Sequence, residues 1–281
     1  MIRSLLVCTD GSSYGDVACE YAMDLSARLR AQLSALHVID ARLLEGPLMA
    51  DLSNWIGAQP YGAQVPQFRE LLNRKGETIL EAFTQKCAAR NLSPNTLLSN
   101  GHPVHVILDE EAKTELLILG QKGEHAGWAE HLMGSTVERI VRQSLRPCLV
   151  TPAHFRPITK MIVAFDGSGH AAKALHEGIE LAQELKVALS LVTVADSETP
   201  EASAEQILKD GLNLVKAHAF EAESAVVKGK TAVAILDHAR RQNGDLIVMG
   251  AFGHSRIREM ILGSTTAQVV ASAGLPVLLV R

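Results

Sequence analysis

The residues of this chain whose types and spacing could do chemistry are Gly250-Ala251-Phe252-Gly253, followed by Gly263-Ser264-Thr265. An apolar run precedes them, and a run with helical spacing follows. The unpaired backbone N–H groups at a helix N-terminus attract anions, and glycines let an anion approach the backbone closely. This order of strand, glycine loop and helix start therefore predicts a phosphate site, to which Ser264 and Thr265 would add hydroxyl donors.

A looser copy of the pattern lies earlier in the chain, at Gly120-Gln121-Lys122-Gly123 and Gly134-Ser135-Thr136. Residues 254–262 separate the inner glycines of the second pattern, whereas residues 124–133 separate those of the first, one residue more. An added residue in a phosphate loop turns later N–H groups away from their target. We therefore expect the second site to be the better formed.

Both loops could also be ordinary glycine turns between surface segments. Neither has the Gly-Lys-Ser/Thr of a phosphate-binding P-loop, and no G-x-G-x-x-G follows the first strand of either copy. P-loop NTPase chemistry and hydride transfer are therefore poorly supported. The charged residues close to the loops, Lys122, His125, His254 and Arg256, are interpreted as solvated loop charges.

Asp10 and Asp166 each end the first strand of a copy, where parallel sheets bind ligands. Such a carboxylate could accept hydrogen bonds from a nucleotide or help to hold Mg²⁺. It could equally form a turn or a helix cap, because Asp-Gly-Ser favours both. The sequence leaves the two roles open, and one carboxylate can serve both.

The two copies extend well beyond the loops. Asp10-Gly11-Ser12 matches Asp166-Gly167-Ser168 at an offset of 156 (166 minus 10), and the match continues over some forty residues. Within each copy, strands alternate with helices, which predicts an α/β fold of two repeated five-stranded open parallel sheets. We expect domains at residues 1–153 and 157–281, with an irregular insertion at residues 41–73 and a helix from about residue 67 to 91 after it.

The composition fits two globular domains. The chain has 281 residues, 47% of them apolar, and a net charge of −4, which gives no drive toward nucleic acid or an anionic membrane. The four cysteines form no C-x-x-C pair and are expected to be reduced. No charged-then-apolar leader and no long apolar run is visible, which predicts a soluble cytoplasmic protein.

Together these features resemble the universal stress protein family in its tandem form. The resemblance rests on Asp-Gly-Ser, on His37-Val38-Ile39-Asp40, on the glycine pattern at 250–265 and on the Pro-Val-Leu-Leu-Val end. It implies a fold of adenine-nucleotide-binding (Rossmann-like, HUP) type, with ATP, alone or with Mg²⁺, as the ligand. The residues that the resemblance implies are, in the second half, Asp166, Val194, Gly250, Gly253, Gly263, Ser264 and Thr265, and in the first half Asp10, Val38, Gly120, Gly123, Gly134, Ser135 and Thr136.

The resemblance also implies that the last strands of the two halves pair within one molecule, and a homodimer of chains is expected. The favoured function is an ATP-binding stress-response regulator in which the second half holds most of the nucleotide. A slow ATPase or other nucleotide-dependent enzyme, and a nucleotide-free interaction scaffold, remain alternatives. No catalytic residue stands out, and weak ATP hydrolysis is the most activity we expect.

Overall fold

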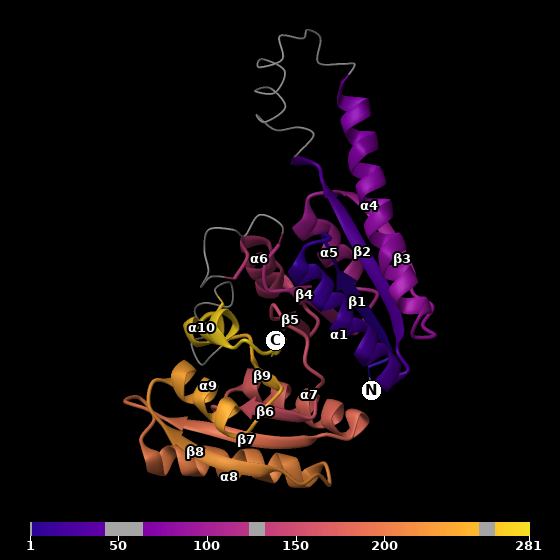
Figure 1. Cartoon of the computed structure of the whole chain (residues 1–281). Coiled ribbons are helices and arrows are strands. Elements are labelled where there is room, and N and C mark those ends of the chain that lie inside the picture. Colours follow the sequence, from indigo (N-terminus) through magenta and orange to yellow (C-terminus); the bar gives the residue numbers. More distant parts are fainter. Residues whose placement is uncertain (1, 43–63, 124–132, 253–261) are drawn as a thin grey trace.

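The computed structural model describes residues 2–42, 64–123, 133–252 and 262–281, along which strands and helices alternate (Figure 1). The strands are β1 Ser4–Cys8, β2 Gln32–Asp40, β3 Asn95–Gly101, β4 Leu116–Gly120, β5 Cys148–Thr151, β6 Lys160–Ala164, β7 Ala188–Ala195, β8 Glu223–Lys228, β9 Leu246–Gly250 and β10 Val277–Val280. The helices are α1 Ser13–Leu29, α4 Gln64–Ala88, α5 Pro103–Glu111, α6 Ser135–Gln143, α7 Gly169–Leu185, α8 Glu201–Ala217, α9 Thr231–Arg241 and α10 Ser264–Ser272.

All ten strands belong to one sheet, in the order β3-β2-β1-β4-β5-β10-β9-β6-β7-β8. Neighbouring strands run parallel within each half, and only β5 and β10 pair antiparallel, with Leu149 opposite Leu278. The order in the second half mirrors that in the first. This confirms two repeated five-stranded parallel units, and it confirms that their last strands pair within one molecule.

The central strands of the sheet are buried on both faces. In β1, Leu5 and Val7 belong to one core cluster and Leu6 to the other, because successive side chains point to opposite faces. Helices α1, α4, α7 and α8 contribute to the first cluster, and α5, α6, α9 and α10 to the second. Each cluster contains residues of both halves, so both cores continue across the β5–β10 seam.

The connection before α4 differs from the prediction. Helix α4 begins at Gln64, slightly before the helix expected from about residue 67 and inside the segment 41–73 that was expected to be irregular. Pro66 is compatible with this start, because proline is tolerated in the first turn of a helix, where its missing N–H would have no partner. The preceding residues 43–63, which hold the rest of the predicted insertion, lie outside the described part of the chain.

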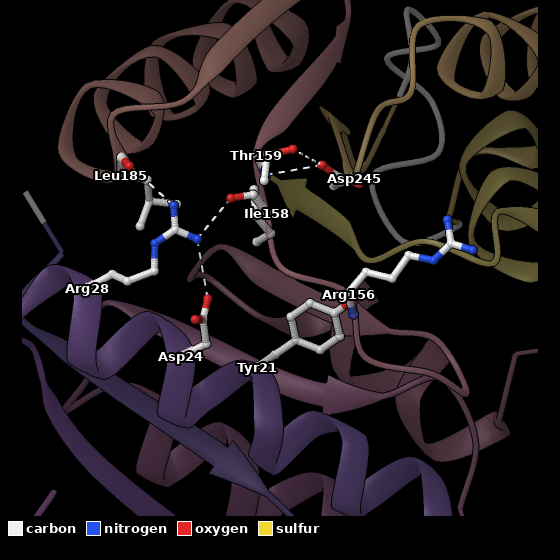
Figure 2. Close-up of polar contacts among 8 residues, drawn as sticks. All are labelled: Tyr21, Asp24, Arg28, Arg156, Ile158, Thr159, Leu185 and Asp245. Carbon is white, nitrogen blue, oxygen red and sulfur yellow. Dashed lines mark hydrogen bonds and ion pairs between the residues drawn. The ribbon is translucent and has the colours of Figure 1, made fainter. Parts of the chain in front are cut away.

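A cluster of polar contacts joins the halves beside the linker (Figure 2). Arg28 of α1 donates to the carbonyl of Ile158 at 2.9 Å and to that of Leu185, the last residue of α7, at 3.2 Å. The Tyr21 hydroxyl accepts a hydrogen bond from the Arg156 N–H at 3.1 Å. These contacts hold the second half against α1, through the end of α7 as well as through the linker.

The structure can be compared with the expectations for the cysteines and for membrane-spanning helices. Cys8, Cys19, Cys87 and Cys148 are all free thiols. Burial raises the pKa of the Cys148 thiol to about 12 and that of Cys87 to about 11. Within the four described ranges, no helix has the length and apolar character needed to span a bilayer.

Candidate functional site

A cavity of about 580 Å³ lies where β6, β7 and β9 end in the second half. Six of the seven residues predicted for this half line it: Asp166, Val194, Gly250, Gly263, Ser264 and Thr265. The seventh, Gly253, lies outside the described residues. The cavity thus sits at the carboxyl ends of parallel strands, which is the usual ligand position in open α/β sheets.

Asp166 shapes the turn that follows β6. Its Oδ1 accepts the N–H of Ser168 at 2.9 Å, and the Ser168 hydroxyl in turn accepts the N–H of Ala171 at 3.1 Å. The serine therefore caps helix α7, while the aspartate forms the turn before it. Asp166 also faces solvent and lines the cavity, so the turn leaves its carboxylate within reach of a ligand.

Gly250 is favoured by the packing of the protein itself. A Cβ at this position would lie 3.0 Å from the Cβ of His170 and 3.3 Å from the N of Ala171, at the start of α7. Gly120 has the same role, because its Cβ would lie 2.8 Å from the carbonyl oxygen of Tyr14 in α1. Both glycines let a helix approach a strand end, a reason that the loop sequence alone did not reveal.

Helix α10 brings backbone donors to the cavity. It begins after Gly263, and the N–H groups of its first turn have no partner within the helix. The Thr266 hydroxyl donates to the carbonyl of Gly250 at 3.2 Å, which ties this turn to the end of β9. The start of α10 therefore presents a partial positive charge to the cavity, together with the Ser264 and Thr265 residues that line it.

The cavity wall also contains two polar residues, Asp196 and Thr231, that the sequence analysis did not select. Asp196 accepts hydrogen bonds from the Thr231 hydroxyl at 2.8 Å and from the Thr199 N–H at 2.9 Å. The Thr231 bond is the main cause that lowers the pKa of the Asp196 carboxyl. The available signal was the repeat, since Asp40, the last residue of β2, matches Asp196, which directly follows β7.

The first half builds its strand ends differently. Thr193 in the second half donates from its hydroxyl to the carbonyl of Phe165 at 2.9 Å. The matching residue of the first half is His37, whose Nδ1 donates to the carbonyl of Thr9 at 2.8 Å. Both side chains are buried, but the larger imidazole of His37 fills more space beside the first-half strand ends.

The glycine loop of the first half lies against Asp10. A Cβ on Gly123 would lie 2.9 Å from Asp10 Oδ2, so the loop backbone is next to the carboxylate. Asp10 is half-buried there, whereas Asp166 is exposed. Val38, Gly120, Gly134, Ser135 and Thr136 occupy the same places at strand ends and at the start of α6 as their second-half counterparts do around the cavity.

The interpretation of Lys122 as a solvated loop charge is wrong. Its side chain is buried, and its Nζ lies 6.0 Å from the ring centroid of Tyr14. The matching position of the second half is Phe252, which lines the cavity. His125, His254 and Arg256 fall outside the described residues. In the described ranges, no group of three or more histidine, cysteine or acidic residues is placed to hold a metal ion.

Strand ends, a glycine loop and a helix N-terminus that meet at one edge of an open parallel sheet define a Rossmann-like α/β protein. The chain belongs to the universal stress protein family, because the model of that family matches residues 1–152 and again residues 157–281. The repeat is therefore a tandem pair of universal stress protein units.

Full-length relatives share this organisation. Universal stress protein Slr1230 from Synechocystis sp. is 32% identical over 291 residues, and the match covers 100% of both chains. Universal stress protein Rv2005c from Mycobacterium tuberculosis is 25% identical over 295 residues, covering 99% of this chain and 97% of the relative. The crystal structure of a universal stress protein from Archaeoglobus fulgidus has the same fold, with a TM-score of 0.76 at 20% identity over 99% of this chain and 98% of that one.

Proposed function

We propose that the second half of this universal stress protein binds ATP and that the protein acts as an ATP-binding stress-response regulator. The observation that carries the proposal is the cavity of about 580 Å³ at the strand ends, with the N-terminus of α10 in its wall. Its volume lies within the range of about 300–1,000 Å³ typical of small-molecule sites. The donors of α10 suit an anion, and the volume suits a nucleotide.

The residues around the cavity divide into two groups. At one end, the N–H groups of the first turn of α10 and the hydroxyls of Ser264 and Thr265 would hold phosphates. At the other, the backbone of Val194 and the paired Asp196 and Thr231 supply donors and acceptors suited to a base and a ribose. Asp166 lies between the end of β6 and the cavity. Its carboxylate would accept hydrogen bonds from the nucleotide or coordinate a Mg²⁺ ion together with the phosphates.

We propose that the first half binds ATP weakly or not at all. Three features support this asymmetry: the loop is one residue longer, its Gly123 lies against Asp10, and Lys122 takes the place of the cavity-lining Phe252. A ligand at the first site would have to move the loop away from Asp10. Within this proposal, the two domains are residues 1–153 and 157–281, and two chains form a homodimer.

A matched pair of variants tests the assignment. Gly263→Val and Gly134→Val add the same side chain at equivalent helix starts, of which only the first lines the described cavity. We expect Gly263→Val to weaken ATP binding, measured by calorimetry, by at least about tenfold, equivalent to about 1.4 kcal/mol. Gly134→Val should weaken binding far less, because Gly134 does not line the described cavity, and one nucleotide should bind per chain.

The outcomes separate the competing functions. Two ATP molecules bound per chain with similar affinity would contradict the asymmetry. An unchanged affinity of a folded Gly263→Val variant would contradict the site. Release of ADP rather than ATP from protein purified without added nucleotide would favour the slow ATPase, and no bound or titratable nucleotide would favour the scaffold.

A further inference from the structure

The far end of the helix that lines the cavity is held by a residue of the other half. The side-chain amide of Gln121, in the first-half glycine loop, donates to the carbonyl of Val270 at 2.9 Å. Val270 lies in the last turn of α10, where carbonyl groups have no donor within the helix. The first half thus supplies a hydrogen bond that caps the C-terminal end of α10.

Gln121 is itself firmly placed. Its backbone N–H donates to Thr151 at the end of β5, and its carbonyl accepts from the N–H of Gly134, each at 2.9 Å. Its side chain is only 8% exposed. The donor to Val270 therefore extends from a backbone that is fixed to the central sheet on one side and to the start of α6 on the other.

The two ends of α10 are mechanically connected. A helix of nine residues is about 13 Å long and moves as a unit, so a shift at Val270 is transmitted to Ser264 and Thr265 in the cavity wall. The second-half loop has Ala251 where the first has Gln121, and the backbone bond of Ala251 to Val280 repeats that of Gln121 to Thr151. An alanine has no amide, so this loop cannot return the same contact to α6.

We propose that Gln121 is a positioning residue for the anion-binding end of α10, contributed by the first half to the site of the second. The proposal rests on the proposed function for its ligand, and on the Gln121–Val270 contact for its mechanism. In this proposal, the first-half glycine loop holds α10 in place and does not bind a nucleotide of its own.

The test uses Gln121→Met, which keeps the length of the side chain and removes the donor. The matched control is Tyr21→Phe, which removes a contact between the first half and the linker, the bond from the Arg156 N–H, on the α1 side of the molecule. Amide hydrogen exchange of residues 264–270 is measured on the nucleotide-free full chain. Calorimetry with MgATP then gives the affinity of each variant.

We expect Gln121→Met to speed exchange in α10 and to raise the Kd for ATP, each by about 2- to 10-fold, as expected for one buried neutral hydrogen bond. Tyr21→Phe should leave both quantities within about twofold of the wild type. Unchanged exchange in Gln121→Met would overturn the proposal, and so would equal effects of the two variants, which would indicate a general loosening of the seam. If the wild type bound no ATP, the proposed function would fail, while exchange in α10 would still decide whether Gln121 holds the helix.

Discussion

At the scale of single residues, His238 in α9 is a buried histidine whose protonation state affects stability. It is 3% exposed, and its Nε2 lies 3.3 Å from the hydroxyl of Ser190 in β7. Burial lowers its pKa, and the positive charges of Arg241 and Lys160 lower it further, against a smaller opposing effect of Glu223. The folded protein therefore resists protonation of this imidazole.

This shift predicts a loss of stability in mild acid. Below the unfolded-state pKa of about 6.5, His238 binds a proton in the unfolded chain but stays neutral in the folded chain. The free energy of unfolding therefore falls as the pH falls, by up to about 1.4 kcal/mol per pH unit. The loss ends once the pH is below the lowered folded-state pKa. His238→Gln should flatten this dependence, measured by urea unfolding between pH 7.5 and 5.0.

The control for this measurement is His154→Gln, which changes an exposed histidine in the linker. We expect it to keep the pH dependence of the wild type. A His238→Gln variant whose unfolding free energy still falls as steeply as that of the wild type would show that other groups cause the acid sensitivity.

The sequence predicted the residues of the site better than the reasons for them. Asp166 and Gly250 were selected as ligand contacts, and both line the cavity. The turn that Asp166 forms was one of its two expected roles, whereas the room that Gly250 makes for α7 was not expected. Gln121 and Val270 are 149 positions apart, so no local pattern could join them. Likewise, the burial of Lys122 beside Tyr14 depends on tertiary packing that spacing does not encode.

At the scale of elements, helix α1 is joined to α7 by Arg28, which donates to the carbonyl at the end of α7 and to that of Ile158 (Figure 2). We expect Arg28→Ala to cost about 1.5–3 kcal/mol in the free energy of unfolding, because two carbonyls lose a charged donor. The positive charge of Arg28 at the C-terminus of α7 adds to this loss, because it interacts favourably with the helix dipole. Chemical denaturation at neutral pH measures this difference.

Arg90→Ala is the matched control, because Arg90 also bonds to α1, through Glu20, but in an exposed ion pair. Such a pair contributes about 0–1 kcal/mol, so this variant should stay close to the wild type. If both variants lost the same stability, the contact with the end of α7 would have no special role.

The elements show where sequence patterns predict structure well. The central strands of this sheet are buried on both faces, so they appear in the sequence as short apolar runs, for example Leu116–Gly120 of β4 and Leu246–Gly250 of β9. The start of α4 was placed too late, because Pro66 and the glycines before it were interpreted as signs of irregular structure. Proline near a helix start gives the same local signal as proline in a loop.

At the scale of the whole molecule, the antiparallel β5–β10 pair turns two repeats into one sheet. Three residues of each strand face the other, with Leu149 and Leu278 at the centre. Both side chains are 1% exposed and belong to the same core cluster, which contains residues of α1 and α7. The seam therefore lies within a continuous core, and either half alone would expose a strand edge and apolar surface.

This arrangement predicts the behaviour of the separated halves. A fragment of residues 1–156 keeps Phe155, whose ring packs edge-on against Tyr21 at 4.8 Å, but it exposes the edge of β5. Exposed strand edges tend to pair with other strands. The β5 strands of two fragments can pair antiparallel, with Leu149 of one fragment opposite Leu149 of the other. We therefore expect the fragment to have twice its formula mass, measured by light scattering at micromolar concentration.

Adding a fragment of residues 157–281 should convert this homodimer into a one-to-one complex. In the native pair, the Leu185 carbonyl accepts from Arg28 and the Val270 carbonyl accepts from Gln121, and we expect these two hydrogen bonds to favour it over a pair of first halves. The preference should weaken when the first fragment carries both Arg28→Ala and Gln121→Met. Fragments that stay monomeric alone and when mixed would contradict the view that the β5–β10 seam drives the assembly of the molecule.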